Sequence, residues 1–172
     1  RRHKPGRAME RSYYRFDILS DFGSFRDLQR HRMLTIDWQK LSTFNGFSVP
    51  DVIEEINFRD KWEEIMKEIG EYFEYLASKY GFHVAQYIVP FSYNIRYSMQ
   101  FNVREAYHLL ELRTSPQGHV DYRRVCQKMH DLILNKAGHK ILGKSMKYVD
   151  HNSYDLERID AERAAEKKRT KK

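Results

Sequence analysis

The feature that constrains this chain most is the stretch of residues 51–80, in which apolar side chains recur at steps of three and four residues. Acidic residues and lysines fill most of the positions between them. This spacing is typical of an amphipathic helix, which buries one stripe of its surface. It predicts one long helix or a broken pair of helices, and Gly81 is placed to end it. The apolar positions are Val52, Ile53, Ile56, Trp62, Ile65, Met66, Ile69, Phe73 and Leu76.

Two other stretches, residues 12–19 and 93–101, alternate between apolar and polar side chains. A period of two predicts half-buried strands. Ser20 and Asp21 offer an N-cap for a short helix after the first of them. Residues 33–39 either extend this helix or start a strand. Further helices are expected over residues 102–113 and 121–135, so the elements together predict one α+β domain over residues 1–160.

Composition excludes several classes of protein. Of 172 residues, 41% are apolar and 32% are charged, which does not suit a collagen-like, disordered or membrane protein. Cys126 is the only cysteine, so no internal disulfide can form, and its helical neighbours indicate a packing role. We therefore expect a cytoplasmic protein. The chain also lacks an initiator Met, which suggests a fragment, a processed chain or one half of a longer polypeptide.

The net charge of +7 is concentrated at the end of the chain, where five lysines and arginines fall in the last six residues. We predict that residues 161–172 are a basic, disordered tail, since such a run is usually a frayed and solvated helix end. A nucleic-acid contact through this tail is the less favoured alternative. No membrane partner is expected.

The first polar cluster is Arg30-His31-Arg32, at the end of the short helix. Successive helical residues point about 100° apart, so these three side chains cannot serve one small site unless the backbone leaves the helix there. Arginine binds phosphate through paired hydrogen bonds, which favours an extended anionic ligand. The alternative is a solvated basic turn.

The second cluster runs from Asn102 through Arg104 and His108 to Arg113. Asn102 and Arg113 fall on nearly one helix face, with roughly 16 Å between them along the axis. A dinucleotide or two neighbouring ligands could contact both. The alternative is an ordinary amphipathic helix with Arg104, Glu105 and Arg113 solvated. The histidines show no metal-ligand spacing, so no metal site is expected.

Together the two clusters resemble the signature regions of the flavin-dependent thymidylate synthases. That family carries Arg-His-Arg, then seven residues and a Ser, followed far downstream by Asn-x-Arg and a Leu-Arg pair on one helix. Arg30-His31-Arg32, Asn102-Val103-Arg104 and Leu112-Arg113 match in order and spacing. Residues 87–90, Tyr-Ile-Val-Pro, resemble an apolar stretch of the family that ends in Pro. The resemblance covers residues 3–137.

The resemblance implies a mixed fold with a small antiparallel sheet flanked by long helices, assembled as a homotetramer. It also implies FAD as cofactor and the reductive methylation of dUMP to dTMP with methylenetetrahydrofolate and NADPH. By position, Arg113 would face the uracil as the catalytic cation. The residues that would hold the flavin nucleotide are Arg30, His31, Arg32, Asn102, Arg104 and His108.

The departures from the family pattern fall mainly in the dUMP site. Lys40 stands where the family has Ser, Ser42 and Gln86 stand where it has Arg, and Trp38 replaces a Glu. The resemblance therefore implies an altered substrate pocket, whose residues are Asp27, Arg30, Lys40, Ser42, Gln86 and Arg113. Two alternatives stay open. The domain is an enzyme, alone or completed by a companion domain of the same kind, or it is a non-catalytic nucleotide-binding or oligomerisation module.

Overall fold

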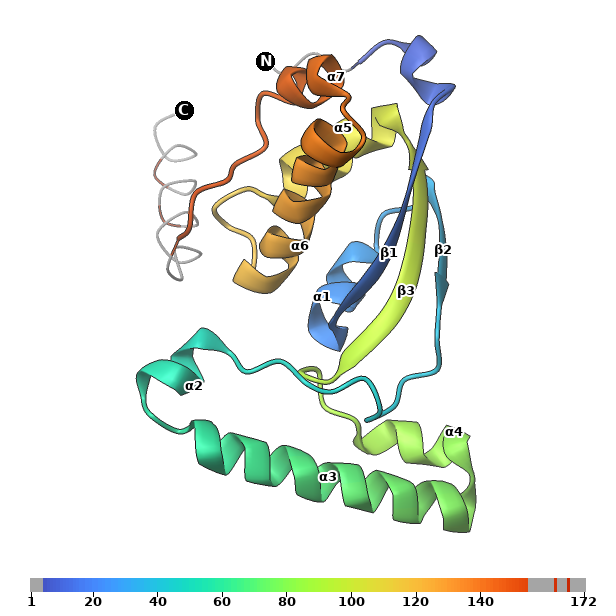
Figure 1. Ribbon diagram of the computed structural model, residues 1–172, viewed down its shortest axis with the longest axis vertical. Helices are drawn as coiled ribbons and strands as arrows, with labels where there is room; N and C mark the ends of the chain where they lie inside the picture. Colours follow the sequence, from blue (N-terminus) through green and yellow to red (C-terminus); the bar gives the residue numbers. More distant parts are fainter. Residues whose placement is uncertain (1–4, 155–162, 164–166, 168–172) are drawn as a thin grey trace. The chain divides into compact units, whose positions relative to one another are not determined.

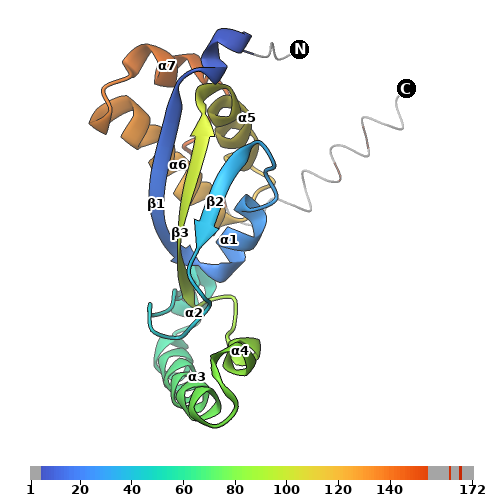
Figure 2. The same cartoon turned by 90° about the vertical axis from the view of Figure 1, so that its right-hand side faces the viewer.

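A computed structural model describes residues 5–154, 163 and 167. Its three strands form one antiparallel sheet in the order β1-β3-β2 (Figures 1 and 2). The bounds are Tyr13–Asp21 for β1, Leu34–Trp38 for β2 and Asn94–Asn102 for β3. The predicted strands at residues 12–19 and 93–101 are therefore confirmed. Of the two alternatives for residues 33–39 the strand is correct: residues 34–38 form β2, in which half-buried Leu34 and Ile36 alternate with exposed Thr35 and Asp37.

Helices make up most of the rest, and with the sheet they confirm the predicted α+β class. Short 3-10 turns cover Arg7–Glu10 and Gln86–Ile88, and a π-helical turn covers Leu132–Lys136. The α-helices are α1 (Phe22–Leu28), α2 (Asp51–Glu55), α3 (Arg59–Tyr80), α4 (Phe82–Ala85), α5 (Val103–Arg113), α6 (Val120–Asp131) and α7 (Lys140–Ser145).

The chain divides into two compact units. Unit 1 comprises the described residues within 1–16, 31–34 and 100–172, and unit 2 comprises residues 17–30 and 35–99. Strands β1 and β3 each run from one unit into the other along the chain. The single domain over residues 1–160 stays a prediction, because compactness does not test whether each unit folds alone.

Unit 2 contains the long amphipathic stretch, which is a broken pair of helices. The break follows α2 at Asn57, whose φ of +54° is left-handed and ends the helical run. Gly81 ends α3 with a φ of +88°, as its position predicted. Along α3 the side chains of Met66 and Phe73 are buried, and α4 lies beside this helix (Figure 1).

Unit 1 is built on α5, α6 and the π-helical turn. Leu109 and Leu110 of α5 are fully buried, as is Cys126 of α6, which confirms the packing position expected for that cysteine. Helix α7 was not predicted from the sequence. It depends on Gly143, where a Cβ would lie 2.4 Å from Leu134 Cδ2, so the Leu134 side chain packs directly against the backbone of this glycine.

Among the described residues, no helix combines the length and apolar character needed to cross a bilayer. The predicted basic tail, residues 161–172, lies outside the described residues except for Arg163 and Lys167.

Candidate functional site

The candidate site in unit 1 is centred on His31. Helix α1 ends at Leu28, and residues 31–32 have no regular secondary structure, so the backbone leaves the helix before the Arg-His-Arg cluster. As a result, the side chains of Arg30, His31 and Arg32 lie in different environments. His31 is 8% exposed, whereas Arg30 and Arg32 are exposed to solvent.

The imidazole of His31 joins the two ends of α5. Its Nδ1 lies 2.9 Å from Glu105 Oε1, and Arg113 Nε donates a hydrogen bond of 3.0 Å to its Nε2. An arginine can only donate, so Nε2 must carry a lone pair and the ring proton must sit on Nδ1. His31 is therefore neutral in this arrangement, and it donates to the carboxylate of Glu105.

The helical spacing of α5 explains how both contacts reach one ring. Glu105 and Arg113 are eight residues apart, which is about two turns and places them on one face. Their long side chains extend toward each other along that face, and His31 lies between the two polar ends. Glu105 is 7% exposed, so the alternative in which this residue is solvated is wrong.

Two further residues fix Arg113. Its guanidinium lies over the ring of Tyr122, 5.4 Å from the centroid. Arg123, only 2% exposed, donates from Nε to the carbonyl oxygen of Thr114 at 3.0 Å, which holds the backbone directly after Arg113. Neither role could be predicted from the sequence, because both residues have the spacing of ordinary members of an amphipathic helix.

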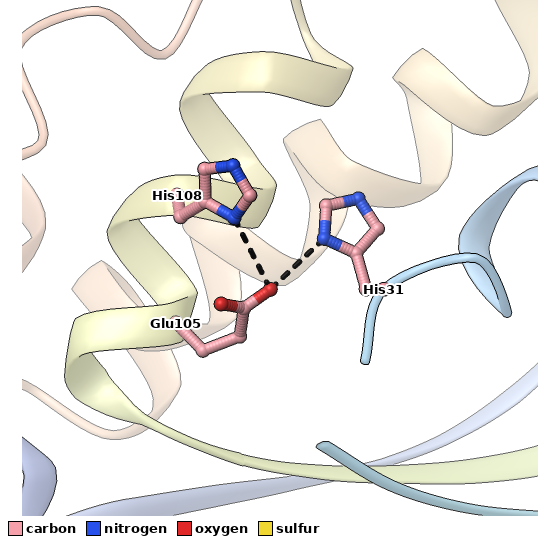
Figure 3. Close-up of side chains that lie close together, drawn as sticks. All are labelled: His31, Glu105 and His108. Carbon is pink, nitrogen blue, oxygen red and sulfur yellow. Dashed lines mark hydrogen bonds and ion pairs between the residues drawn. The ribbon is translucent and has the colours of Figure 1, made fainter. Parts of the chain in front are cut away.

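His108 lies one turn after Glu105 on α5. Its Nδ1 is 3.4 Å from Glu105 Oε1, the same oxygen that His31 contacts (Figure 3). The centroids of the two imidazole rings are 5.4 Å apart, and the side chain of His108 is 63% exposed. The ligand atoms of His31, Glu105 and His108 all lie within 4.8 Å of one another, a spacing that a metal ion could bridge. This group of three possible metal ligands could not be predicted from the sequence, because His31 is 74 residues away from Glu105.

Two other predicted flavin residues of unit 1, Asn102 and Arg104, have partners within the protein. Asn102 is the N-cap of α5, and its side chain accepts a hydrogen bond of 2.9 Å from the backbone N–H of Glu105. Arg104 forms a hydrogen-bonded ion pair with Glu10, which the sequence did not single out. That hydrogen bond from Arg104 lowers the pKa of the Glu10 carboxyl below its usual value. Arg32 makes no hydrogen bond or ion pair with any described residue.

The predicted substrate residues lie in unit 2, apart from Arg113. Gln86 Oε1 accepts a hydrogen bond of 3.1 Å from the backbone N–H of Leu41, which connects it to the segment carrying Lys40 and Ser42. The ammonium of Lys40 lies over the ring of Phe82, 5.5 Å from its centroid. Ser42 is buried, and its Oγ lies 3.4 Å from the backbone N of Phe44.

The two remaining candidates of unit 2, Asp27 and Arg30, are three residues apart on the chain and form an ion pair. Arg30 Nη1 is 3.5 Å from Asp27 Oδ1. The side chain of Arg30 is nevertheless 68% exposed, so its guanidinium is still accessible to an anionic ligand.

Comparison with known proteins gives one matching family and several related sequences. The family described as thymidylate synthase complementing protein matches residues 1–137. The UPF0159 protein Ta1429 of Thermoplasma acidophilum is 37% identical over 163 residues, which is 94% of this chain and 32% of that protein. A UPF0159 protein of Chlamydia muridarum is 37% identical over 162 residues, covering 94% of this chain and 30% of that protein. The chain thus spans about a third of the length of these relatives.

A solved structure shares the fold. The crystal structure of thymidylate synthase X from Helicobacter pylori with FAD and dUMP aligns with a TM-score of 0.61 and 18% identity. The alignment covers 80% of this chain and 74% of that one.

Proposed function

The chain belongs to the thymidylate synthase complementing protein family, and from this premise we propose that it binds FAD and methylates dUMP to dTMP. The proposed donors are methylenetetrahydrofolate for the carbon and NADPH for the reducing equivalents. The Helicobacter pylori protein of the same fold, crystallised with FAD and dUMP, supports this choice of ligands.

The observation that carries the proposal is the meeting of the two signature segments at His31. This buried ring connects the Arg-His-Arg segment to Glu105 and Arg113 on α5, although the segments are far apart in the sequence. A structural helix face alone would not need a buried polar bridge, because burying polar groups carries a cost unless each is paired.

The residues present suit an anionic dinucleotide such as FAD. The guanidinium of Arg32 is exposed and has no partner among the described residues, and arginine binds phosphate oxygens through paired hydrogen bonds. When bound, the flavin would supply the reducing equivalents for the methyl group. Arg30, His31, Asn102, Arg104 and His108 are proposed to complete the binding set.

Arg113 has the features of a residue that stabilises charge developing on the uracil ring. A guanidinium stays protonated at any physiological pH, so its charge is fixed. His31 and the ring of Tyr122 hold this guanidinium in one orientation before any ligand binds. A preorganised cation of this kind lowers the energy of an anionic transition state more than a mobile one does.

The dUMP pocket is proposed to be altered. Gln86 and Ser42 stand where the family has arginines, and both are engaged in contacts with the backbone of unit 2. An arginine cannot accept the hydrogen bond that Gln86 takes from Leu41. The substrate phosphate is therefore proposed to bind through Lys40, Arg30 and a neighbouring subunit or companion domain. The alternative function, a non-catalytic nucleotide-binding or oligomerisation module, is favoured by these same engaged side chains.

Two measurements test the proposal. Purified protein should show flavin absorbance or a rise in melting temperature on adding FAD. With NADPH and methylenetetrahydrofolate, it should release tritium from dUMP labelled at C5. Arg113→Ala should lower that rate by about 100-fold or more, as removal of one charge-stabilising donor does. Arg15→Ala, an exposed arginine of β1, is the matched control and should leave the rate unchanged.

Each outcome decides between the two functions. A protein that binds FAD but releases no tritium would favour the non-catalytic alternative. Absence of both flavin binding and tritium release would show that the proposed function is wrong.

A further inference from the structure

We propose that His31, Glu105 and His108 form a binding site for a divalent transition-metal ion, with Zn²⁺ as the best match. We further propose that metal binding at this site excludes the hydrogen bond from Arg113 to His31. The metal would thus be a regulator of the site described above, not a part of its reaction.

The geometry of the three side chains supports the site. Both imidazole Nδ1 atoms approach the same carboxylate oxygen, Glu105 Oε1, at 2.9 and 3.4 Å (Figure 3). Tetrahedral zinc with bonds of about 2.1 Å places its ligand atoms about 3.4 Å apart. All three ligand atoms already lie within 4.8 Å of one another, so small side-chain movements would suffice to bind an ion.

The chemistry of the donors selects the class of metal. Two imidazoles and one carboxylate form the ligand set of many zinc sites that keep an open coordination position. Mg²⁺ and Ca²⁺ prefer oxygen ligands alone, so neither ion suits this set. His31 and Glu105 are buried, whereas His108 is exposed and leaves solvent access for an entering ion and a bound water.

Arg113 opposes metal binding because it donates a hydrogen bond to Nε2, the ring nitrogen of His31 that would not bind the metal. A neutral imidazole that binds metal through Nδ1 carries its proton on Nε2, where it needs an acceptor. In this structure Nε2 faces a donor instead, the Nε–H of Arg113 at 3.0 Å. The two arrangements of His31 therefore exclude each other, and bound metal would remove the hydrogen bond between His31 and the guanidinium of Arg113.

One consequence rests on the proposed function. His31 and His108 are both proposed flavin ligands, so Zn²⁺ should compete with FAD and lower the rate of thymidylate formation. The metal site itself does not depend on the flavin, because its three ligands come from this chain alone.

Equilibrium dialysis of metal-free protein against Zn²⁺ tests the proposal directly. We expect one Zn²⁺ per chain, and visible absorption bands of a four-coordinate ion when Co²⁺ is used instead. His108→Ala should weaken Zn²⁺ binding by at least about tenfold. His83→Ala removes an exposed histidine of unit 2 and should leave the affinity unchanged.

A second variant probes the opposing role of Arg113. Arg113→Gln replaces the donor by a side chain whose carbonyl can accept from Nε2–H, and it should tighten Zn²⁺ binding by about 10-fold. No variant that only disturbs the fold would strengthen binding. Melting curves of each variant without metal show that it is folded.

The inference is wrong if wild-type protein binds no Zn²⁺, if His108→Ala and His83→Ala weaken binding equally, or if Arg113→Gln weakens it. Separate titrations with FAD distinguish this from failure of the proposed function. Normal FAD binding without Zn²⁺ binding would refute the metal site alone, whereas the reverse would refute the flavin site alone.

Discussion

At the scale of single residues, neighbours in one motif differ in their environments. Of the three consecutive basic residues Arg30, His31 and Arg32, His31 is buried and both arginines are exposed. Glu105, whose carboxylate oxygen lies 2.9 Å from His31 Nδ1, is buried as well. Its partner lies 74 residues away, so no local pattern could have indicated the pairing.

Cys126 gives a prediction about pH at this scale. Burial raises the pKa of its thiol to about 12 in the folded protein, whereas a free thiol titrates near about 8.5. Below that lower value both states are protonated. Above it the unfolded chain loses the proton and the folded chain keeps it, so the free energy of unfolding falls as pH rises through this window.

Urea unfolding at pH 8 and pH 10 measures the effect. The free energy of unfolding of wild type should fall between these values by about 2 kcal/mol more than that of Cys126→Ala. The comparison removes the contributions of tyrosines and lysines, which both proteins share. Equal pH dependence in the two proteins would contradict the prediction.

At the scale of elements, the N-cap of α5 leads to a prediction about the stability of the fold. Asn102→Ala removes the acceptor for the Glu105 N–H and should lower the free energy of unfolding by about 1 kcal/mol. Asn102→Asp keeps an acceptor oxygen at the cap and should retain full stability. Chemical denaturation checks both values, and equal losses in the two variants would exclude the capping role.

The elements that the sequence predicted are those with a local cause. Alternation identifies β1 and β3, and three- and four-residue spacing identifies α5 and the α2–α3 pair. The short helix α7 was missed because its six residues contain Gly143, a poor helix former. Its conformation depends on packing against Leu134, which is a tertiary contact. The π-helical turn after α6 was likewise predicted as ordinary helix.

At the scale of the whole molecule, the sequence predicted which segments matter but not how they connect. The family spacing identified Arg104 and Arg113 as site residues. It did not identify their partners, because the ion pair of Arg104 with Glu10 spans 94 residues and the hydrogen bond of Arg113 to His31 spans 82. Long-range pairs of this kind are determined by tertiary packing, which no periodicity reports.

The exposed face of α3 bears on the oligomeric state, which stays a prediction. Ile65, Tyr72 and Tyr75 are 36%, 56% and 48% exposed. At 100° per residue they fall within about 80° of the helix circumference. Aromatic residues gathered on one exposed face are typical of protein interfaces. We therefore expect another subunit to cover this face in a homo-oligomer.

Light scattering on protein eluting from a sizing column tests this expectation. Wild-type chain should elute as a multiple of its 20.8 kDa mass. The double variant Ile65→Glu with Tyr72→Glu should shift to the monomer mass, because two buried carboxylates at an interface lack partners. Lys67→Glu changes the charge on another face of α3 and should leave the oligomer intact. A wild-type chain that elutes as a monomer would refute the homo-oligomer and leave a companion domain as the partner to seek.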